Sequence, residues 1–135
     1  MQIGFIGVGL MGFPMAKNLL KSGYQLKAFN RSQDKAERLK EFGAEISVSI
    51  KDVVTNSDII ITMLTDDNAV EKVMDSDEFI FNIKEGATVI DMSSVNPVLA
   101  IKYSKKLKEK KVNYLDAPVS GGTIGAEEAT LAIMI

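Results

Sequence analysis

Three glycines near the start of the chain have the spacing that a bound diphosphate requires. They form a G-x-G-x-x-G pattern over Gly7, Val8, Gly9, Leu10, Met11 and Gly12. In such a pattern the first glycine permits a tight turn, the second lets the backbone approach a pyrophosphate, and the third lets the following helix lie close to the strand. Free backbone N–H groups at the start of that helix, together with the helix dipole, favour an anion. The pattern therefore predicts a dinucleotide-binding loop.

The segments on either side of these glycines supply the context that such a loop needs. An apolar run at Ile3, Phe5 and Ile6 is typical of a buried strand, and a helical pattern follows directly after the loop. Pro14 falls in the first turn of that helix, where its missing N–H is no loss. A tight strand-to-helix turn without a ligand is the alternative interpretation, and the context on both sides favours nucleotide binding.

A second group of polar residues follows the next expected strand. Asn30, Arg31 and Ser32 stand where NAD-binding enzymes place an acid for the ribose 2′-hydroxyl, and the first acid downstream is Asp34. An arginine there suits the 2′-phosphate of NADP, because a guanidinium meets a phosphate as a charged planar fork. Asn30 and Ser32 can donate hydrogen bonds to the same phosphate. The alternative is an exposed loop arginine beside a helix-capping serine, and we expect NADP to be preferred over NAD.

Two further segments are expected near the cofactor because strands end there. Met63, Leu64 and Thr65 follow the fourth expected strand, where main-chain atoms would line the nicotinamide ribose. Their mainly apolar character indicates a core position, so this expectation depends on topology alone. Ser93 and Ser94 follow the fifth strand and are placed to hydrogen-bond near the nicotinamide carboxamide.

The stretch 116–122, D-A-P-V-S-G-G, places a hydroxyl beside two glycines at the end of a strand. Ser120 offers an oxygen, while Gly121 and Gly122 offer backbone N–H groups that a substrate carboxylate can approach. The stretch is not a nucleophile elbow, because the G-x-S-x-G frame is missing and the chain has no histidine to activate the serine. From the residues alone, a plain turn and a carboxylate clamp are equally open.

The composition limits the classes of function. The net charge is −2 and the lysines are scattered, so we expect no nucleic acid partner. Cysteine and histidine are both absent, which excludes disulfides, thiolate chemistry and imidazole catalysis and makes a metal site unexpected. Glycine and proline interrupt the apolar start too often for a membrane span, and no signal-peptide pattern precedes it. We therefore expect a cytoplasmic protein without a membrane partner.

Strands and helices alternate along the 135 residues, which we expect to form one domain. Strands are expected at 3–6, 26–29, 45–48, 59–64, 88–91, 113–119 and 131–135. Helices are expected at 10–22, 32–42, 66–73 and 96–110, with Ser32 and Asn96 as caps, a brief helix from Ser49 and a helical turn within 75–84. This alternation predicts an α/β fold of the Rossmann type, a doubly wound and mainly parallel sheet in the order 3-2-1-4-5-6 with its ligands at the carboxyl ends of the strands.

Two motifs make the chain resemble a known family. The segments G-F-I-G-V-G-L-M-G-F-P-M-A-K-N-L and D-A-P-V-S-G-G-T-I-G-A are similar to those of the β-hydroxyacid dehydrogenases. That family includes 3-hydroxyisobutyrate dehydrogenases and tartronate semialdehyde reductases, and the glyoxylate/succinic semialdehyde reductase type is the most similar. The resemblance implies that the glycine loop binds the pyrophosphate, that Asn30 and Arg31 match NADP-preferring members, that Ser94 lies beside the nicotinamide, and that the stretch 120–122 holds the substrate carboxylate.

The resemblance also implies that this chain is one part of a longer enzyme. Family members continue into an all-helical domain whose connecting helix supplies the catalytic lysine, followed by an asparagine that helps to hold the substrate. We expect that lysine to lie beyond Ile135, and no lysine of this chain matches its position, so we assign no catalytic residue. We expect a domain that binds NADPH and turns over substrate negligibly by itself, and a full-length protein that forms a homo-oligomer.

The expected function is that of the cofactor domain of an NADP-dependent oxidoreductase, which interconverts a small β-hydroxyacid or related hydroxyacid and its semialdehyde or keto form. An imine reductase is a rival, since it resembles the glycine loop and the Asn30–Arg31 pair, although the stretch 116–122 argues against it. A non-catalytic nucleotide sensor or oligomerisation module is another. An S-adenosylmethionine methyltransferase also has a glycine-rich first loop, but it usually has an acid where this chain has Asn30.

Overall fold

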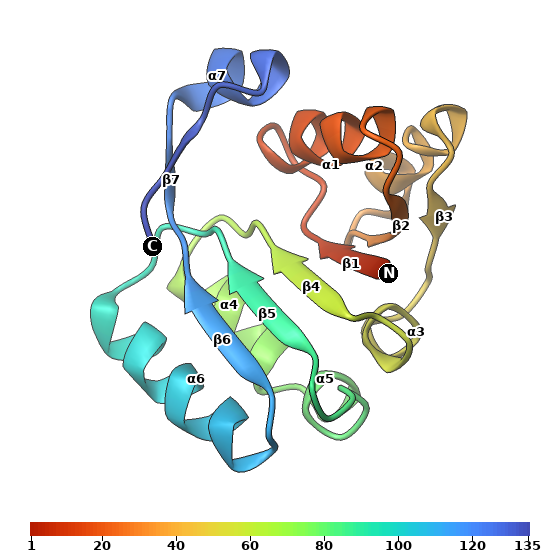
Figure 1. The fold of residues 1–135 in the computed structure, drawn as a ribbon. Helices are drawn as coiled ribbons and strands as arrows, with labels where there is room; N and C mark the ends of the chain where they lie inside the picture. Colours follow the sequence, from red (N-terminus) through yellow and green to blue (C-terminus); the bar gives the residue numbers. More distant parts are fainter.

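A parallel sheet organises the chain in the computed structural model, which describes residues 1–135. Its six strands are β1 (Gln2–Ile6), β2 (Gln25–Phe29), β3 (Glu45–Ile46), β4 (Ile59–Thr62), β5 (Thr88–Asp91) and β6 (Asn113–Asp116). They lie in the order β3-β2-β1-β4-β5-β6, and every neighbouring pair is parallel (Figure 1). The predicted Rossmann-type order is therefore confirmed.

Helices cover both faces of this sheet (Figure 1). One face carries α1 (Gly12–Lys21), α2 (Gln33–Glu37) and the 3₁₀ turn η1 (Lys40–Phe42). The other face carries α3 (Ile50–Thr55), α4 (Asp67–Met74), α5 (Asp77–Ile80) and α6 (Pro97–Glu109). None of the helices combines the length and the hydrophobicity that crossing a bilayer requires.

Two hydrophobic cores fill the spaces between the sheet and these helices. Successive side chains of a strand point to opposite faces, so Ile60 packs into the core under α3 to α6 while Ile61 packs into the core under α1 and α2. The first core also buries Phe79 and Tyr103, and the second buries Phe5. Burial on both faces explains why the strands β1 and β4 are apolar almost throughout.

Some elements are shorter than their sequence patterns predict. The expected helix 32–42 is divided into α2 and η1, and β4 ends at Thr62 because Leu64 N–H donates to the Ser93 hydroxyl instead of to a strand. The expected strand 113–119 ends at Asp116, just before Pro118, which has no N–H to donate to a ladder. Asn96 caps α6 as predicted, with its side chain accepting from Val98 N–H.

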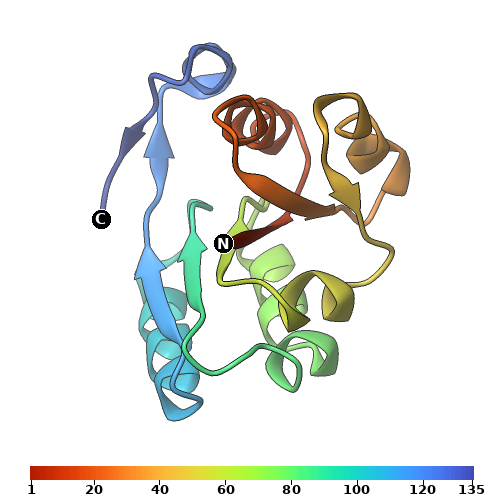
Figure 2. The same ribbon diagram turned by 45° about the vertical axis from the view of Figure 1, so that its right-hand side comes forward.

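The last segment of the chain stands beyond the edge strand β6 (Figure 2). Two short strands, β7 (Val119–Ser120) and β8 (Ala132–Ile133), pair antiparallel, and α7 (Gly122–Glu128) connects them. The Asn18 side chain of α1 donates to the Ala126 carbonyl at 2.7 Å, so α7 is tied to the first helix.

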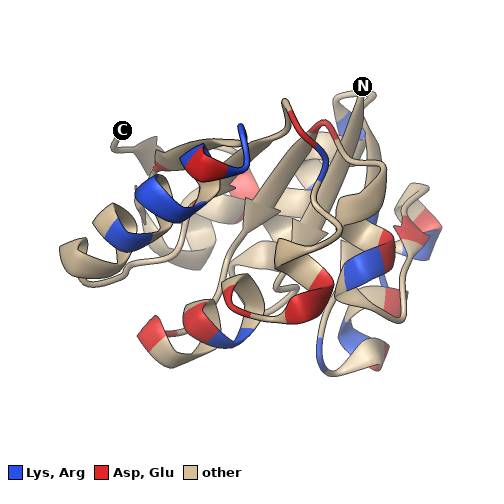
Figure 3. Cartoon of the chain, turned by 90° about the horizontal axis from the view of Figure 1, so that it is seen from below, with Lys and Arg blue, Asp and Glu red and all other residues tan.

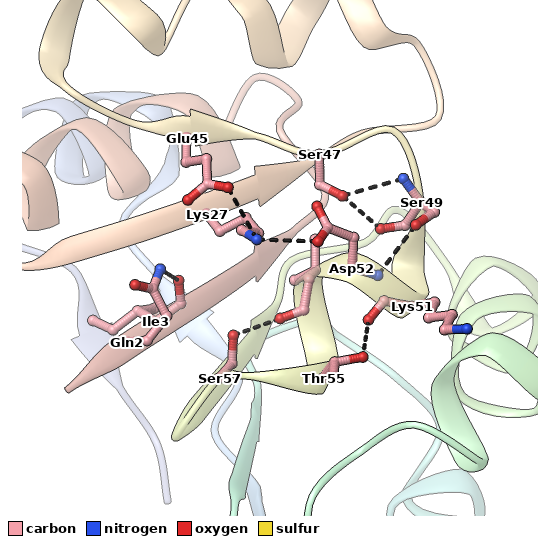
Figure 4. Close-up of polar contacts among 11 residues, drawn as sticks. Gln2, Ile3, Lys27, Glu45, Ser47, Ser49, Lys51, Asp52, Thr55 and Ser57 are labelled. Atoms are coloured by element: carbon pink, nitrogen blue, oxygen red, sulfur yellow. Dashed lines mark hydrogen bonds and ion pairs between the residues drawn. The ribbon is translucent and has the colours of Figure 1, made fainter.

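Residues of both charge signs are interspersed along the helices in the view of Figure 3. The most buried ion pair lies at the amino end of the sheet, where the Lys27 side chain is only 12% exposed. Its Nζ contacts Glu45 at 3.0 Å and Asp52 at 3.1 Å, and Figure 4 shows it between the two carboxylates. Burial opposes the charge of Lys27, but the hydrogen bonds to both acids outweigh it and raise the pKa of the amine above its usual value.

Candidate functional site

The glycine loop joins the carboxyl end of β1 to α1. Gly7 has a φ of 101°, and a Cβ there would overlap the Met63 carbonyl oxygen of the neighbouring strand end. A Cβ at Gly12 would overlap the Gly7 carbonyl oxygen, so the helix lies directly on the turn. At Gly9, by contrast, nothing lies within 4 Å of the position of a Cβ. The tight turn and the close packing match the expected glycine roles, and the open side at Gly9 leaves room for a ligand.

Backbone donors of this loop have no acceptor within the chain. Helical hydrogen bonding begins with Phe13 N–H, which donates to the Gly9 carbonyl at 3.0 Å, whereas the N–H groups of Gly9, Leu10 and Met11 donate to no protein group. Such donors at the start of a ten-residue helix suit an anion, because the positive end of the helix dipole lies there.

Asn30 connects the glycine loop to the loop after β2. Val8 N–H donates to Asn30 Oδ1 at 2.8 Å, and Asn30 Nδ2 donates to the Ser32 carbonyl at 2.9 Å. We expected the Asn30 side chain to donate to a 2′-phosphate, and one of its two amide hydrogens remains free to do so. Ser32 holds the N-cap position of α2 as predicted, but its side chain does not make the hydrogen bond expected of a cap. Lys35 N–H donates instead to the Ser32 carbonyl, in a helix of only five residues.

A cleft of about 310 Å³ opens at the carboxyl ends of β1, β2 and β4. The structure brings together in it three of the predicted groups, namely the glycine loop through Gly7 and Gly9, the loop 30–32, and the segment 63–65. Val8 and Leu10 face a second cavity of about 450 Å³, which runs along α1 and shares Gly9 and Lys35 with the cleft. Met11 and Gly12 line neither cavity, so their proposed contacts depend on the backbone of the loop.

Two lysines that the sequence analysis did not single out also line the cleft. Lys35 lies in the first turn of α2, four residues after Arg31, and Lys72 reaches the cleft from α4. Lys35 was a readable candidate because it falls in the first turn of the helix expected after Arg31, whereas the position of Lys72 follows only from the packing of α4 against the sheet. The cleft therefore has three cationic side chains around it and one acid, Asp66.

A buried carboxylate connects the carboxyl ends of β4 and β5 to Tyr114 of β6. Asp91 is fully buried, and its Oδ1 accepts from Thr62 Oγ1 at 2.9 Å and from Ser93 N–H at 3.1 Å. Its Oδ2 accepts from the Tyr114 hydroxyl at 3.3 Å. Burial and the carboxylates of Asp91 and Asp116 raise the pKa of Tyr114 well above its usual range, which keeps the phenol protonated as a donor. Burial and Asp91 likewise raise the pKa of Asp116.

The remaining predicted residues lie outside the 310 Å³ cleft. Ser94 is exposed just after the end of β5, and Ser120 is exposed at the end of β7. Gly121 and Gly122 follow Ser120 with φ values of 136° and 61°, so both occupy conformations that favour glycine. The structure thus gathers the predicted cofactor residues of β1, β2 and β4, and it leaves Ser94 and the stretch 120–122 on the side of β5 and β6.

The final residues of the chain contribute no side chain to the cleft. The expected strand 131–135 is shorter in the structure, because only Ala132 and Ile133 pair with β7. Ile135, beyond which we expect the family's catalytic lysine, is 87% exposed and does not line the cleft. The lysines that do line it, Lys35 and Lys72, come from α2 and α4 and do not match the position of that lysine. The place of the catalytic lysine therefore stays a prediction.

Known proteins match this fold and this loop. The family model described as the NAD binding domain of 6-phosphogluconate dehydrogenase matches residues 2–135. The 2-(hydroxymethyl)glutarate dehydrogenase of Eubacterium barkeri is 44% identical over 135 residues, which are 99% of this chain and 45% of that protein. The structure of Mycobacterium tuberculosis 3-hydroxyisobutyrate dehydrogenase with L-serine superposes with a TM-score of 0.93 at 31% identity, over 98% of this chain and 45% of that one.

An imine reductase from Myxococcus stipitatus in complex with NADP+ is also similar, with a TM-score of 0.86 and 27% identity over 93% of this chain and 43% of that one. The chain therefore spans less than half the length of each protein that it is compared with here. The resemblance to the β-hydroxyacid dehydrogenases that two sequence motifs indicated is confirmed over nearly all of the chain. The chain belongs to the family of the NAD binding domain of 6-phosphogluconate dehydrogenase, which the β-hydroxyacid dehydrogenases share.

Proposed function

We propose that the chain is the cofactor domain of an NADP-dependent oxidoreductase that acts on a small hydroxyacid. The observation that carries this proposal is the position of the free N–H donors of the glycine loop next to the cleft that Arg31 also lines. A dinucleotide fits these residues, because Gly9 leaves open space where its diphosphate would approach the backbone. When bound, the nicotinamide supplies or accepts the hydride. The protein's part is to bind this cofactor and to orient it against the substrate.

The charge of the cleft supports NADP over NAD. Arg31 makes no hydrogen bond or ion pair within the chain, so its guanidinium is available to a 2′-phosphate, and Lys35 and Lys72 add positive charge nearby. Ser32 leaves its hydroxyl free of a capping bond, and Asn30 retains one amide hydrogen. No acid stands after β2 to bind a 2′-hydroxyl, because Asn30 occupies that position. The Oδ1 of Asn30 already accepts a hydrogen bond from Val8 N–H.

The substrate class follows from what the relatives' names have in common. 2-(Hydroxymethyl)glutarate, 3-hydroxyisobutyrate and L-serine each carry a hydroxymethyl group on the carbon next to a carboxylate. We infer a β-hydroxyacid of this kind as the substrate of the whole enzyme, with Ser120, Gly121 and Gly122 holding its carboxylate. Homo-oligomerisation of the whole enzyme belongs to the same proposal. So does a cytoplasmic location, although bovine and rat relatives are named mitochondrial.

Titration of residues 1–135 with NADPH and NADH in parallel tests the cofactor assignment. Substituting Arg31→Ala should weaken NADPH binding roughly ten- to a hundredfold and leave NADH binding unchanged, because a charge-assisted hydrogen bond contributes about 1.5 to 3 kcal/mol. Arg38→Ala is the matched control, since Arg38 stacks on the Phe13 ring at 4.3 Å and does not line the cleft. Unchanged NADPH affinity in Arg31→Ala would contradict the phosphate assignment.

An imine reductase is the second candidate, favoured by the similarity to the Myxococcus stipitatus enzyme. The two candidates share the glycine loop and differ in the group that the stretch 116–122 would face. A protein that contains this chain and its catalytic domain should oxidise NADPH with a semialdehyde and not with a cyclic imine. The opposite preference would make the imine reductase the better assignment.

A further inference from the structure

The carboxylate of Asp91 lies apart from the residues that we expect to bind the adenosine part of a dinucleotide. It lies at the end of β5, away from Arg31 and the loop after β2, and it is not among the residues that line the cleft. Nevertheless its side chain is fully buried, and no Lys or Arg forms an ion pair with it. A buried carboxylate without a cation is costly unless hydrogen bonds satisfy it.

Three donors satisfy this carboxylate, namely Thr62 at the end of β4, Ser93 just after the end of β5, and Tyr114 within β6. Thr62 and Ser93 donate to its Oδ1 at 2.9 and 3.1 Å, and Tyr114 donates to its Oδ2 at 3.3 Å. Thr62 and Ser93 are themselves fully buried. Because charge-assisted hydrogen bonds are stronger than neutral ones, Asp91 fixes the ends of β4 and β5 relative to each other and to Tyr114 of β6.

Ser93 extends this connection into the wall of the cleft. Its backbone N–H donates to Asp91, while its Oγ accepts from Leu64 N–H at 2.9 Å. Leu64 is the middle residue of the segment 63–65, which lines the cleft, and the exposed Ser94 follows Ser93 directly. The side chain of Ser93 therefore sets where the main chain turns away from β4, and its backbone sets where Ser94 stands.

We propose that Asp91 and Ser93 are positioning residues for the nicotinamide half of the dinucleotide, which act by holding the segment 63–65 and Ser94 in place. This inference rests on the proposed cofactor function. It assigns the two halves of the cofactor to separate hydrogen-bond networks, because Asn30 joins only the glycine loop and the loop after β2. No hydrogen bond connects the Asn30 network to the Asp91 network.

Two ligands separate these halves experimentally. NADPH contains both halves, whereas adenosine 2′,5′-bisphosphate contains only the adenosine half with its 2′-phosphate. For Ser93→Ala in residues 1–135 we expect NADPH to bind roughly three- to tenfold more weakly, which corresponds to the loss of one hydrogen bond, while the bisphosphate binds as it does to the unchanged chain. The fluorescence enhancement of the bound reduced nicotinamide should fall in the same variant, because its ring is held less firmly.

Two further variants keep the test independent of stability. Ser57→Ala is the matched control, because Ser57 is a buried serine that bonds the Val53 carbonyl at 2.5 Å and lies outside the cleft, and both ligands should bind it unchanged. Asp91→Asn keeps an oxygen for Thr62 and Ser93, so it should retain most of the nicotinamide fluorescence that Asp91→Ala loses.

The outcomes distinguish this inference from the function on which it rests. If the unchanged chain binds neither ligand, the dinucleotide function fails and the positioning role fails with it. If the unchanged chain binds both ligands, but Ser93→Ala leaves NADPH affinity and fluorescence unaltered or weakens both ligands equally, only the positioning role is overturned. Selective loss of NADPH affinity and fluorescence, with a normal bisphosphate affinity, supports it.

Discussion

The amino end of the sheet and the glycine loop at its carboxyl end treat polar groups in opposite ways. At the amino end, charged side chains pair with each other, as Lys27 does with Glu45 and Asp52 (Figure 4). In the glycine loop and beside it, the N–H groups of Gly9, Leu10 and Met11 and the guanidinium of Arg31 have no partner within the chain. Both regions are polar, so composition does not distinguish them. They differ in whether their polar groups already have partners within the chain.

Asp58, also at the amino end, likewise has its polar partners within the chain. Asp58 accepts from Gln2 N–H at 2.7 Å and forms an ion pair with Lys84, and both contacts hold its pKa below the usual value. Exposed pairs of this kind contribute little to stability, but they engage charged groups that would otherwise face a ligand unpaired. The glycine loop keeps the N–H donors of Gly9, Leu10 and Met11 free, which is the condition for binding an anion there.

Substitution in the glycine loop should disturb the carboxyl end most. Gly7→Ala places a Cβ against the Met63 carbonyl at a φ of 101°, so we expect a loss of about 3 kcal/mol or more in the free energy of unfolding and no dinucleotide binding. Urea denaturation and NADPH titration measure the two effects. Gly23→Ala is the control, because Gly23 has a φ of 90° but open space around it, and only about 1 kcal/mol should be lost there. Equal losses in the two variants would show that steric overlap is unimportant at Gly7.

The ion pairs of Asp75, which lie away from the cleft, should make stability depend on pH without affecting cofactor binding. Burial opposes the charge of Asp75, but hydrogen bonds from Lys106, Lys102 and Tyr103 outweigh it and lower its pKa to about 2. Because the folded pKa lies below the unfolded value of 3.8, this stabilisation is present above pH 4 and is lost as the pH falls toward 2.

Asp75→Asn should therefore unfold about 1 kcal/mol more easily at neutral pH, a value reduced for solvent screening because the side chain is 36% exposed. Urea denaturation of both chains at neutral pH and at pH 2 to 4 would show the difference shrinking with acid. NADPH affinity should not change. A difference that stays constant with pH would exclude this carboxylate as its source.

The lysines that line the cleft should contribute less to NADPH binding than Arg31 does. Lys35→Gln should weaken NADPH binding about threefold and NADH binding less, because an exposed cation near a phosphate contributes well under the energy of the Arg31 fork. The difference should shrink as salt is added. Lys21→Gln, which removes a charge from the second cavity but not from the cleft, serves as the control in the same titrations. A salt-independent effect would mean that Lys35 does not act through its charge.

The smallest change concerns α7, outside both ends of the sheet. Ala129 follows this helix with a φ of 58°, a left-handed conformation that favours glycine. Ala129→Gly should raise the free energy of unfolding by about 0.5 kcal/mol, after the greater freedom of glycine in the unfolded chain is subtracted. Thermal unfolding would detect the gain, and a lower midpoint would show that the site tolerates alanine without strain.

The fold was predictable because its signals are local. Apolar runs such as 59–62, left-handed glycines such as Gly43 and caps such as Asn96 each act within a few residues, and the alternation of elements then leaves few topologies. The glycine loop and the segment 63–65 were placed in one cleft for the same reason. The sequence did not reveal that the Asn30 side chain accepts a hydrogen bond from Val8. Nor did it reveal that Asp91 accepts hydrogen bonds from Thr62, Ser93 and Tyr114. The tertiary contacts among these span 22 to 29 residues, and no periodicity encodes them.

The bond from Val8 to Asn30 has a consequence for how a ligand is received. It fixes the loop that would grip the diphosphate at a constant separation from the loop that would select the adenosine, before any ligand arrives. Preorganisation of this kind means that little conformational entropy is lost on association. The spacing between the two expected phosphate sites is therefore set before a ligand binds, and a ligand fits only if the distance between its own phosphates matches that spacing.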